Sequence, residues 1–189
     1  WKIYDFKRGN KMILGKKSYL TSVQPDAIEK LRQWRNNPEI RKYFRTSKEI
    51  TKPMQDKWYH NVNTNPSQCD FEIHDMESGR LVGHIGLYYI DLIARKAEFS
   101  IYIGDMAFRG KGIGSDALRT LIKYGFEELN LNKIWCEVYS NNAAVDIYRK
   151  VGFVDEGVLR QNAFKNGEYV DGIVLSLLND EWLENNKKQ

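Results

Sequence analysis

The stretch Arg109-Gly110-Lys111-Gly112-Ile113-Gly114 decides the fold, because it joins a strand-like segment to a helix-like one. Residues 97–103 alternate as a buried strand does, and residues 115–130 carry apolar side chains at helical spacing. Glycine at every second position lets the chain turn tightly and lets a ligand approach the backbone amides. The unpaired amides at the start of a helix attract anions, and Arg109 and Lys111 add positive charge. The stretch therefore predicts a site for a phosphate-bearing ligand.

Two better-known phosphate loops do not fit this stretch. A P-loop has four residues between its first Gly and its Gly-Lys pair, followed by Ser or Thr. Here five residues separate Gly104 from Gly110, and Gly112 follows Lys111. A dinucleotide fold has G-x-G-x-x-G near the start of a parallel sheet, whereas this run is G-x-G-x-G and lies past mid-chain. A glycine-rich turn that only begins a helix stays open as the alternative.

Length and composition indicate one globular domain. The 189 residues are 42% hydrophobic and 29% charged, with a formal net charge of +4. The basic residues are scattered, which argues against a nucleic-acid partner. Cys69 and Cys136 are the only cysteines and lack metal-ligand spacing, so we expect neither a disulfide nor a metal site. The sequence shows no apolar run of membrane-spanning length and no signal peptide, which predicts a cytoplasmic protein without a membrane partner.

The pattern along the chain predicts an α/β (α+β) domain around a mixed sheet. Residues 1–11 lack an initiating Met and are interpreted as a leader or upstream extension, residues 12–178 as the domain, and residues 179–189 as a frayed polar tail. We expect strands at 12–23, 69–74, 81–89, 97–103, 133–139, 158–164 and 169–178, and helices at 25–34, 38–44, 53–62, 115–130 and 143–150.

A second motif is Asn141-Asn142-Ala143-Ala144-Val145-Asp146-Ile147-Tyr148-Arg149-Lys150-Val151-Gly152-Phe153. Together with the glycine stretch it resembles the paired signatures of the GNAT superfamily of N-acetyltransferases. The resemblance covers residues 12–178 and implies a single-domain, largely antiparallel sheet with helices on both faces, splayed between strands 97–103 and 133–139. It also implies direct transfer of an acetyl group from acetyl-CoA to a primary amine, without a metal.

The resemblance also implies roles for individual residues. It assigns acetyl-CoA to the loop residues Arg109, Gly110, Lys111, Gly112, Ile113 and Gly114, to the strand backbone at Ile101, Tyr102 and Ile103, and to Asn141, for which a helix-cap role is also open. It implies that Tyr148 protonates the departing thiolate, which suits a phenol with a pKa near 10. Packing in the core is the alternative for Tyr148. Glu98 is the candidate base, and a purely structural carboxylate is its alternative.

The acceptor is predicted from Trp34-Arg35-Asn36-Asn37-Pro38-Glu39-Ile40-Arg41 with the following Tyr43-Phe44. This run is similar to one shared by amino-sugar acetyltransferases of pseudaminic acid synthesis and by the RimJ/RimL ribosomal-protein and spermidine acetyltransferases. We expect Trp34, Arg41, Tyr43 and Phe44 to bind the acceptor, although Trp34 and Phe44 also suit a helix–helix core. Stacking aromatics near arginines favour a nucleotide-linked amino sugar.

Other acceptors and other classes of protein stay open. A ribosomal-protein N-terminus and spermidine are the alternative acceptors, and a catalytically silent acetyl-CoA-binding module is the alternative from another class. Three histidines, His60, His74 and His84, stand in no motif and are expected to be structural. The partner is expected to be a small amine, and a homodimer stays open.

Overall fold

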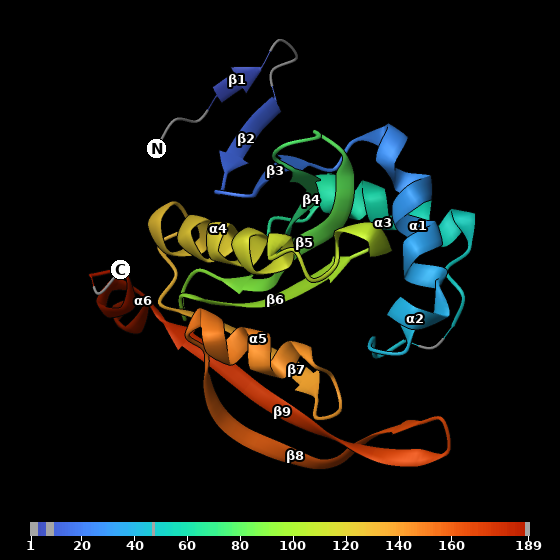
Figure 1. The fold of residues 1–189 in the computed structure, drawn as a ribbon, viewed down its shortest axis with the longest axis vertical. Helices are drawn as coiled ribbons and strands as arrows, with labels where there is room; N and C mark the ends of the chain where they lie inside the picture. Colours follow the sequence, from blue (N-terminus) through green and yellow to red (C-terminus); the bar gives the residue numbers. More distant parts are fainter. Residues whose placement is uncertain (1–3, 7–9, 47, 188–189) are drawn as a thin grey trace.

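The computed structural model describes residues 4–6, 10–46 and 48–187 of the chain. In this part, nine strands form one sheet in the order β1-β2-β3-β4-β5-β6-β7-β9-β8 (Figure 1). The strands are β1 (Tyr4–Phe6), β2 (Asn10–Leu14), β3 (Ser18–Ser22), β4 (Cys69–Asp75), β5 (Leu81–Asp91), β6 (Lys96–Ile103), β7 (Lys133–Tyr139), β8 (Val154–Lys165) and β9 (Glu168–Leu178). The helices are α1 (Ile28–Asn36), α2 (Pro38–Arg41), α3 (Lys52–Thr64), α4 (Ile113–Glu127), α5 (Ala144–Val151) and α6 (Asn179–Lys187), with 3-10 turns η1 (Pro25–Ala27) and η2 (Met106–Phe108).

The centre of the sheet is splayed, as the resemblance implies. Neighbouring strands are antiparallel except β6 and β7, which run parallel. Their ladder joins only residues 96–98 to residues 133–135, although β6 continues to Ile103 and β7 to Tyr139. The two strands therefore diverge past Glu98 and leave strand backbone available inside the sheet.

Alternate side chains of β6 show which helices cover each face. Phe99 packs in the larger core cluster with the fully buried Leu118 and Leu121 of α4. Tyr102 packs in a second cluster with Leu31 of α1. Burying a leucine side chain contributes about 1.5–3 kcal/mol, so the amphipathic α4 is a main source of stability. Helices α4, α5 and α6 thus cover one face and helices α1, α2 and α3 the other (Figure 1).

Two predicted segments differ from the structure. The single strand expected at 12–23 is the hairpin of β2 and β3, which turns at Gly15. A Cβ at Gly15 would lie 2.3 Å from the Asp116 carboxylate, so only glycine fits this turn. The tail expected to be frayed is helical over residues 179–187, because Trp182 is buried and packs beside Phe126. A single aromatic residue thus anchors a mainly polar segment.

The expected leader is described in part. Strand β1 pairs with residues 10–12 of β2, whereas residues 1–3 and 7–9 lie outside the described residues. Its assignment as a leader stays a prediction. None of the helices in the described residues is both long and apolar enough to cross a membrane. The cytoplasmic location and the homodimer also stay predictions.

Candidate functional site

The glycine loop has the backbone conformation that its sequence predicts. Gly110 and Gly112 have φ angles of +74° and +82°, in the left-handed region that side chains disfavour. Gly112 is the N-cap of α4, so no side chain covers the first amides of that helix. A Cβ at Gly110 would meet no atom within 4 Å, so the loop is open to a ligand. These features fit a pyrophosphate at the start of α4.

Two residues of the loop join it to the neighbouring strand. The Arg109 guanidinium donates hydrogen bonds of 3.1 and 3.0 Å to the Ile103 carbonyl, which closes the loop onto the end of β6. Gly114 lies in the first turn of α4, and a Cβ there would stand 3.4 Å from the Ile103 side chain. Arg109 therefore shapes the loop, and its direct contact with a cofactor stays a prediction.

Sequence reasoning missed a third cation at the loop, Lys17. Its ammonium donates a 3.1 Å hydrogen bond to the Lys111 carbonyl and lies 3.2 Å from the position of a Cβ on Gly112. Lys17 comes from the β2–β3 turn, whose amides donate to the Asp116 carboxylate on α4. The two lysines add positive charge where an anionic ligand would bind. A Gly-Lys-Lys turn was visible in the sequence, but its distance of 94 residues from Lys111 hid the contact.

The splay presents backbone rather than side chains. Ile101 and Ile103 pack against the larger cluster, while the Tyr102 ring is buried in the second cluster on the opposite face. The side chains of these three residues are therefore committed to packing. Beyond Glu98, the edge of β6 that faces β7 has left the ladder, so its peptide groups can bind an extended ligand as an added strand would.

Tyr148 lies on α5 beside the splay. Its ring packs against Phe99 at a centroid distance of 5.0 Å and against Phe153 at 6.2 Å. Burial raises the pKa of the Tyr148 hydroxyl above 10, so this group keeps its proton throughout the neutral range. Tyr148 thus combines the packing role with the protonation state that an acid needs.

Asn141 and Asn142, which precede α5, have different surroundings. The Asn142 side chain accepts a 3.0 Å hydrogen bond from the Ala144 amide and so caps the helix, while Asn141 is exposed. The cap role considered for Asn141 thus falls to Asn142. The binding role of Asn141 stays a prediction.

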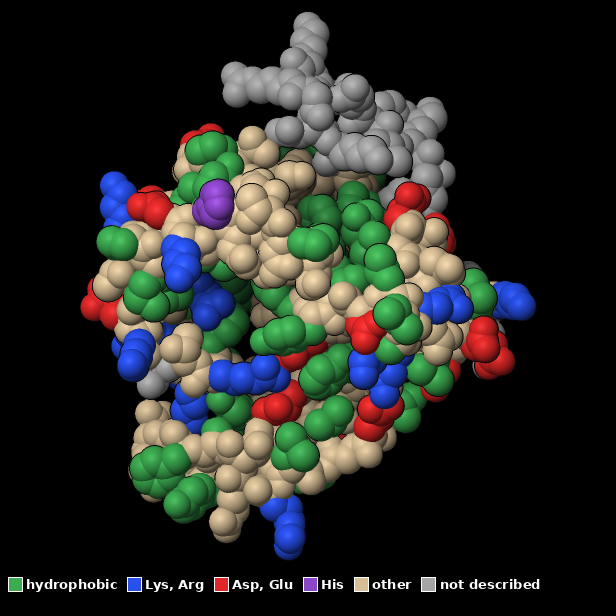
Figure 2. Space-filling model, turned by 180° about the vertical axis from the view of Figure 1, so that it is seen from behind, with side chains coloured by type: hydrophobic (Ala, Val, Ile, Leu, Met, Phe, Trp, Pro, Cys, Tyr) green, Lys and Arg blue, Asp and Glu red, His purple; other side chains and the backbone are tan. Residues whose placement is uncertain are grey.

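A pocket of about 450 Å³ lies between β7 and the β8–β9 hairpin. Figure 2 shows this face of the molecule, on which basic and acidic side chains lie side by side around a hollow. At the pocket, Arg45 Nη2 lies 2.7 Å from Glu98 Oε1 and 3.5 Å from Glu137 Oε2. The Asn162 amide donates to Glu137. The pocket is lined by Arg45, Glu137, Tyr139, Asn162, Ala163, Phe164 and Lys165.

Comparison with known proteins decides the family. The acetyltransferase (GNAT) domain matches residues 18–154. The chain belongs to the GNAT acetyltransferases. It is 40% identical over 105 residues to a putative ribosomal N-acetyltransferase, YdaF of Bacillus subtilis, a match that spans 55% of this chain and 57% of that protein. It is 32% identical over 150 residues to the spermidine N(1)-acetyltransferase of Vibrio cholerae, covering 78% and 85%.

A solved structure resembles this GNAT domain closely. The crystal structure of spermidine N-acetyltransferase from Vibrio cholerae in complex with CoA and spermine aligns with a TM-score of 0.82 and 28% identity. The alignment covers 88% of this chain and 98% of that one. The fold described above is therefore the GNAT fold, as the paired motifs predict.

The predicted acceptor residues of this GNAT chain are partly committed to packing. Trp34 lies flat against Gly104, where a Cβ would stand 2.0 Å from the indole. Phe44 lies between the Arg35 guanidinium, 3.6 Å from its ring centre, and the edge of Tyr102. Of the other two predicted residues, Tyr43 is exposed, whereas Arg41 is half-buried, as Trp34 and Phe44 are. Acceptor binding by all four stays a prediction.

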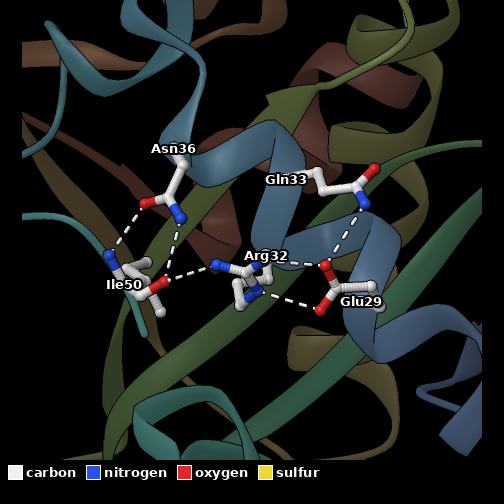
Figure 3. A network of polar contacts seen from close by, with 5 residues as sticks. All are labelled: Glu29, Arg32, Gln33, Asn36 and Ile50. Atoms are coloured by element: carbon white, nitrogen blue, oxygen red, sulfur yellow. Dashed lines mark hydrogen bonds and ion pairs between the residues drawn. The ribbon is translucent and has the colours of Figure 1, made fainter. Parts of the chain in front are cut away.

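Asn36 of the same run has a structural role (Figure 3). Its amide donates to the Ile50 carbonyl at 2.9 Å and accepts from the Ile50 amide at 2.8 Å. Arg32 donates to the same carbonyl and is itself held by Glu29. These contacts tie residue 50, shortly before α3, to α1.

A buried polar cluster lies on the same face as α1, α2 and α3. The Asp70 carboxylate accepts a 2.6 Å hydrogen bond from Tyr88 and a 3.0 Å bond from Gln68. The buried His84 ring places Nε2 3.0 Å from the same carboxylate and stacks beside Tyr102. This arrangement agrees with the structural role expected for His84. Among the described residues, no group of three or more His, Cys, Asp or Glu is placed to hold a metal ion.

Proposed function

We propose that the protein transfers the acetyl group of acetyl-CoA to a primary amine. The observation that carries this is the Arg45 guanidinium held between Glu98 and Glu137. It lies where β6 and β7 have diverged, and two carboxylates beside the splay are therefore placed to pair with a cation. A protonated amine has the same charge and the same hydrogen-bonding preference for carboxylates.

The residues on the other side of the splay fit the cosubstrate. Amides at the start of α4, together with Lys17 and Lys111, would hold the pyrophosphate, and the free edge of β6 would hold the extended arm. Acetyl-CoA supplies an activated thioester when it is bound. Each of these contacts involves backbone or positive charge, as an anionic, extended molecule requires.

The proposed chemistry assigns one proton transfer to each side. Glu98 takes a proton from the acceptor ammonium, directly or through a water molecule, and the free amine then attacks the thioester carbonyl. A carbon–nitrogen bond forms, the carbon–sulfur bond breaks, and the Tyr148 hydroxyl gives its proton to the departing sulfur. The second proton that the attacking nitrogen loses returns to the Tyr148 oxygen through water, so the one proton released overall is the one that Glu98 takes. Burial raises the pKa of Tyr148, so the hydroxyl is protonated at neutral pH when the sulfur departs.

The relatives support the alternative acceptors better than the nucleotide-linked amino sugar. They are named for spermidine and for ribosomal proteins. The amino-sugar prediction depends on accessible arginines, but Arg35 is largely buried and its guanidinium packs on the Phe44 ring. We therefore propose an aliphatic amine, such as spermidine or the α-amine of a peptide, as the first acceptors to test.

The test is release of free CoA in the presence of a panel of amines. The panel contains spermidine, spermine, peptides that begin with Ala or Ser, and a nucleotide-linked amino sugar. We expect turnover with at least one amine and its loss with Tyr148→Phe. Calorimetric binding of acetyl-CoA without turnover of any amine would instead establish the catalytically silent module, and absence of binding would refute the proposed site.

A further inference from the structure

The pocket between β7 and the β8–β9 hairpin is the proposed acceptor pocket, and the charges around it balance one another. Glu98 and Glu137 are two carboxylates whose side chains are only 12% and 16% exposed. Arg45, 55% exposed, lies across them from the solvent side. Lys165 adds a second cation, and its ammonium donates a 2.8 Å hydrogen bond to the Phe44 carbonyl. With two negative and two positive groups, the pocket in this state has no net charge.

We propose that Arg45 makes this site selective for amines that also carry an oxyanion, in preference to polycations. The proposal rests on the proposed function, because it names the acceptor class of the same pocket. The acceptor ammonium replaces the guanidinium at Glu98 and Glu137. The released guanidinium then pairs with a carboxylate or phosphate oxygen of the acceptor, for which its planar fork is suited.

Charge complementarity gives the reason. An acceptor with one ammonium and one oxyanion leaves the pocket neutral and every charged group paired. A polyamine would place further ammonium groups beside the displaced Arg45 and beside Lys165, and like charges at close range oppose binding. Arg45 is also the exposed member of the trio, so it can leave the carboxylates without disrupting the core.

The position of Arg45 makes the exchange feasible. It follows Phe44, which is fixed between Arg35 and Tyr102, so the guanidinium swings from an anchored point. Lys165 binds the Phe44 carbonyl and lies 3.5 Å from the Arg45 carbonyl, which joins this segment to the end of β8. The backbone thus stays in place while the side chain changes partner.

The experiment compares kcat/KM for three kinds of acceptor: spermidine, a neutral amine of similar length, and oxyanion-bearing amines. The last group has two arms, a peptide with Asp at its second position and phosphoethanolamine, which separate carboxylate from phosphate. Wild type, Arg45→Gln and Arg45→Lys are measured at low and high salt. Lys42→Gln is the matched control, because it removes one positive charge from the same segment at an exposed site.

The preference is the ratio of kcat/KM for an oxyanion-bearing amine to kcat/KM for spermidine. We expect Arg45→Gln to lower this ratio by at least about tenfold, mainly through KM. Arg45→Lys should restore part of the preference, and Lys42→Gln should leave it within about twofold. The difference should shrink as salt screens the charges. If Arg45→Gln turns over its acceptors with an unchanged preference, or if wild type prefers spermidine over both oxyanion arms, the selectivity proposal is wrong. Neither outcome would affect the proposed function, which fails only if no amine is acetylated.

Discussion

Asp116 connects the stability of the fold to the cofactor loop, and its replacement is the sharpest test of the site's construction. The carboxylate, in the first turn of α4, accepts hydrogen bonds from the Lys16, Lys17 and Ser18 amides and from the Ser18 hydroxyl, at 2.8 to 3.0 Å. These bonds hold the β2–β3 turn, and with it the Lys17 ammonium, beside Gly112. Asp116→Ala removes all of them.

The loss in the free energy of unfolding depends on which hydrogen-bond donors water can solvate once the Asp116 carboxylate is removed. The amides of Lys16 and Lys17 belong to exposed residues and can be solvated, so their loss costs little. Ser18 is fully buried, and its amide and hydroxyl would be left unpaired at about 1–3 kcal/mol each. Loss of a negative charge at the helix start adds about 0.3–1 kcal/mol. We expect Asp116→Ala to lower the free energy of unfolding by about 2–7 kcal/mol, and Asp116→Asn by less.

Urea unfolding with an unchanged m-value measures this loss. Asp146→Ala is the control, because Asp146 is also an acidic residue in the first turn of a helix but is exposed and forms a surface ion pair with Arg149. Its loss should stay below about 1 kcal/mol, as for a surface ion pair. In the folded Asp116→Asn protein, acetyl-CoA should also bind more weakly. Equal losses for Asp116→Ala and Asp146→Ala would refute the role of the buried donors.

Four further predictions concern the loop, the acid and the thiol. Gly112→Val should weaken calorimetric binding of acetyl-CoA at least about tenfold; Gly167→Val, at a φ of +88° in an open turn, should strain the chain similarly without affecting binding. Lys17→Met should raise the Kd for acetyl-CoA about tenfold, the loss of one charge-assisted contact, and an unchanged Kd would exclude that contact. Tyr148→Phe should lower kcat by about 10²–10⁴ with little change in cofactor affinity, whereas full activity would make the ring a packing residue only. Burial raises the pKa of the Cys69 thiol to about 12, so the folded state keeps a proton that the unfolded chain loses near 8.5. The free energy of unfolding measured in urea should therefore decline as the pH rises above about 8.5. An unchanged free energy of unfolding up to pH 10 would contradict this.

The site residues that the sequence predicts lie in unbroken stretches of the chain. The loop is readable because a left-handed φ at Gly110 and Gly112 requires a specific residue at a specific position. Tyr148 can also be predicted from the sequence, since its motif is an unbroken run that forms one helix and its cap. Local chemistry determines local backbone in both cases.

The parts that the sequence did not predict depend on contacts between distant segments. Lys17 reaches the loop across 94 residues, and Arg45 meets Glu98 and Glu137 across 53 and 92 residues. No periodicity records which surface side chains will meet once the sheet has formed. The helical tail was missed for a related reason: a polar composition indicates solvent exposure, and only the packed position of Trp182 shows that the segment docks.

This difference explains why the sequence predicts the cofactor better than it predicts the acceptor. The proposed cofactor contacts are backbone amides and an open strand edge, which the fold supplies whatever the surface residues are. The proposed acceptor contacts are side chains from the segment after α2, from the central strands and from the hairpin, and each can change without altering the fold. Relatives that share the fold are accordingly named for spermidine and for ribosomal proteins. If Arg45 sets the preferred charge of the acceptor, one exposed side chain is enough to redirect the proposed acetyl transfer to another amine.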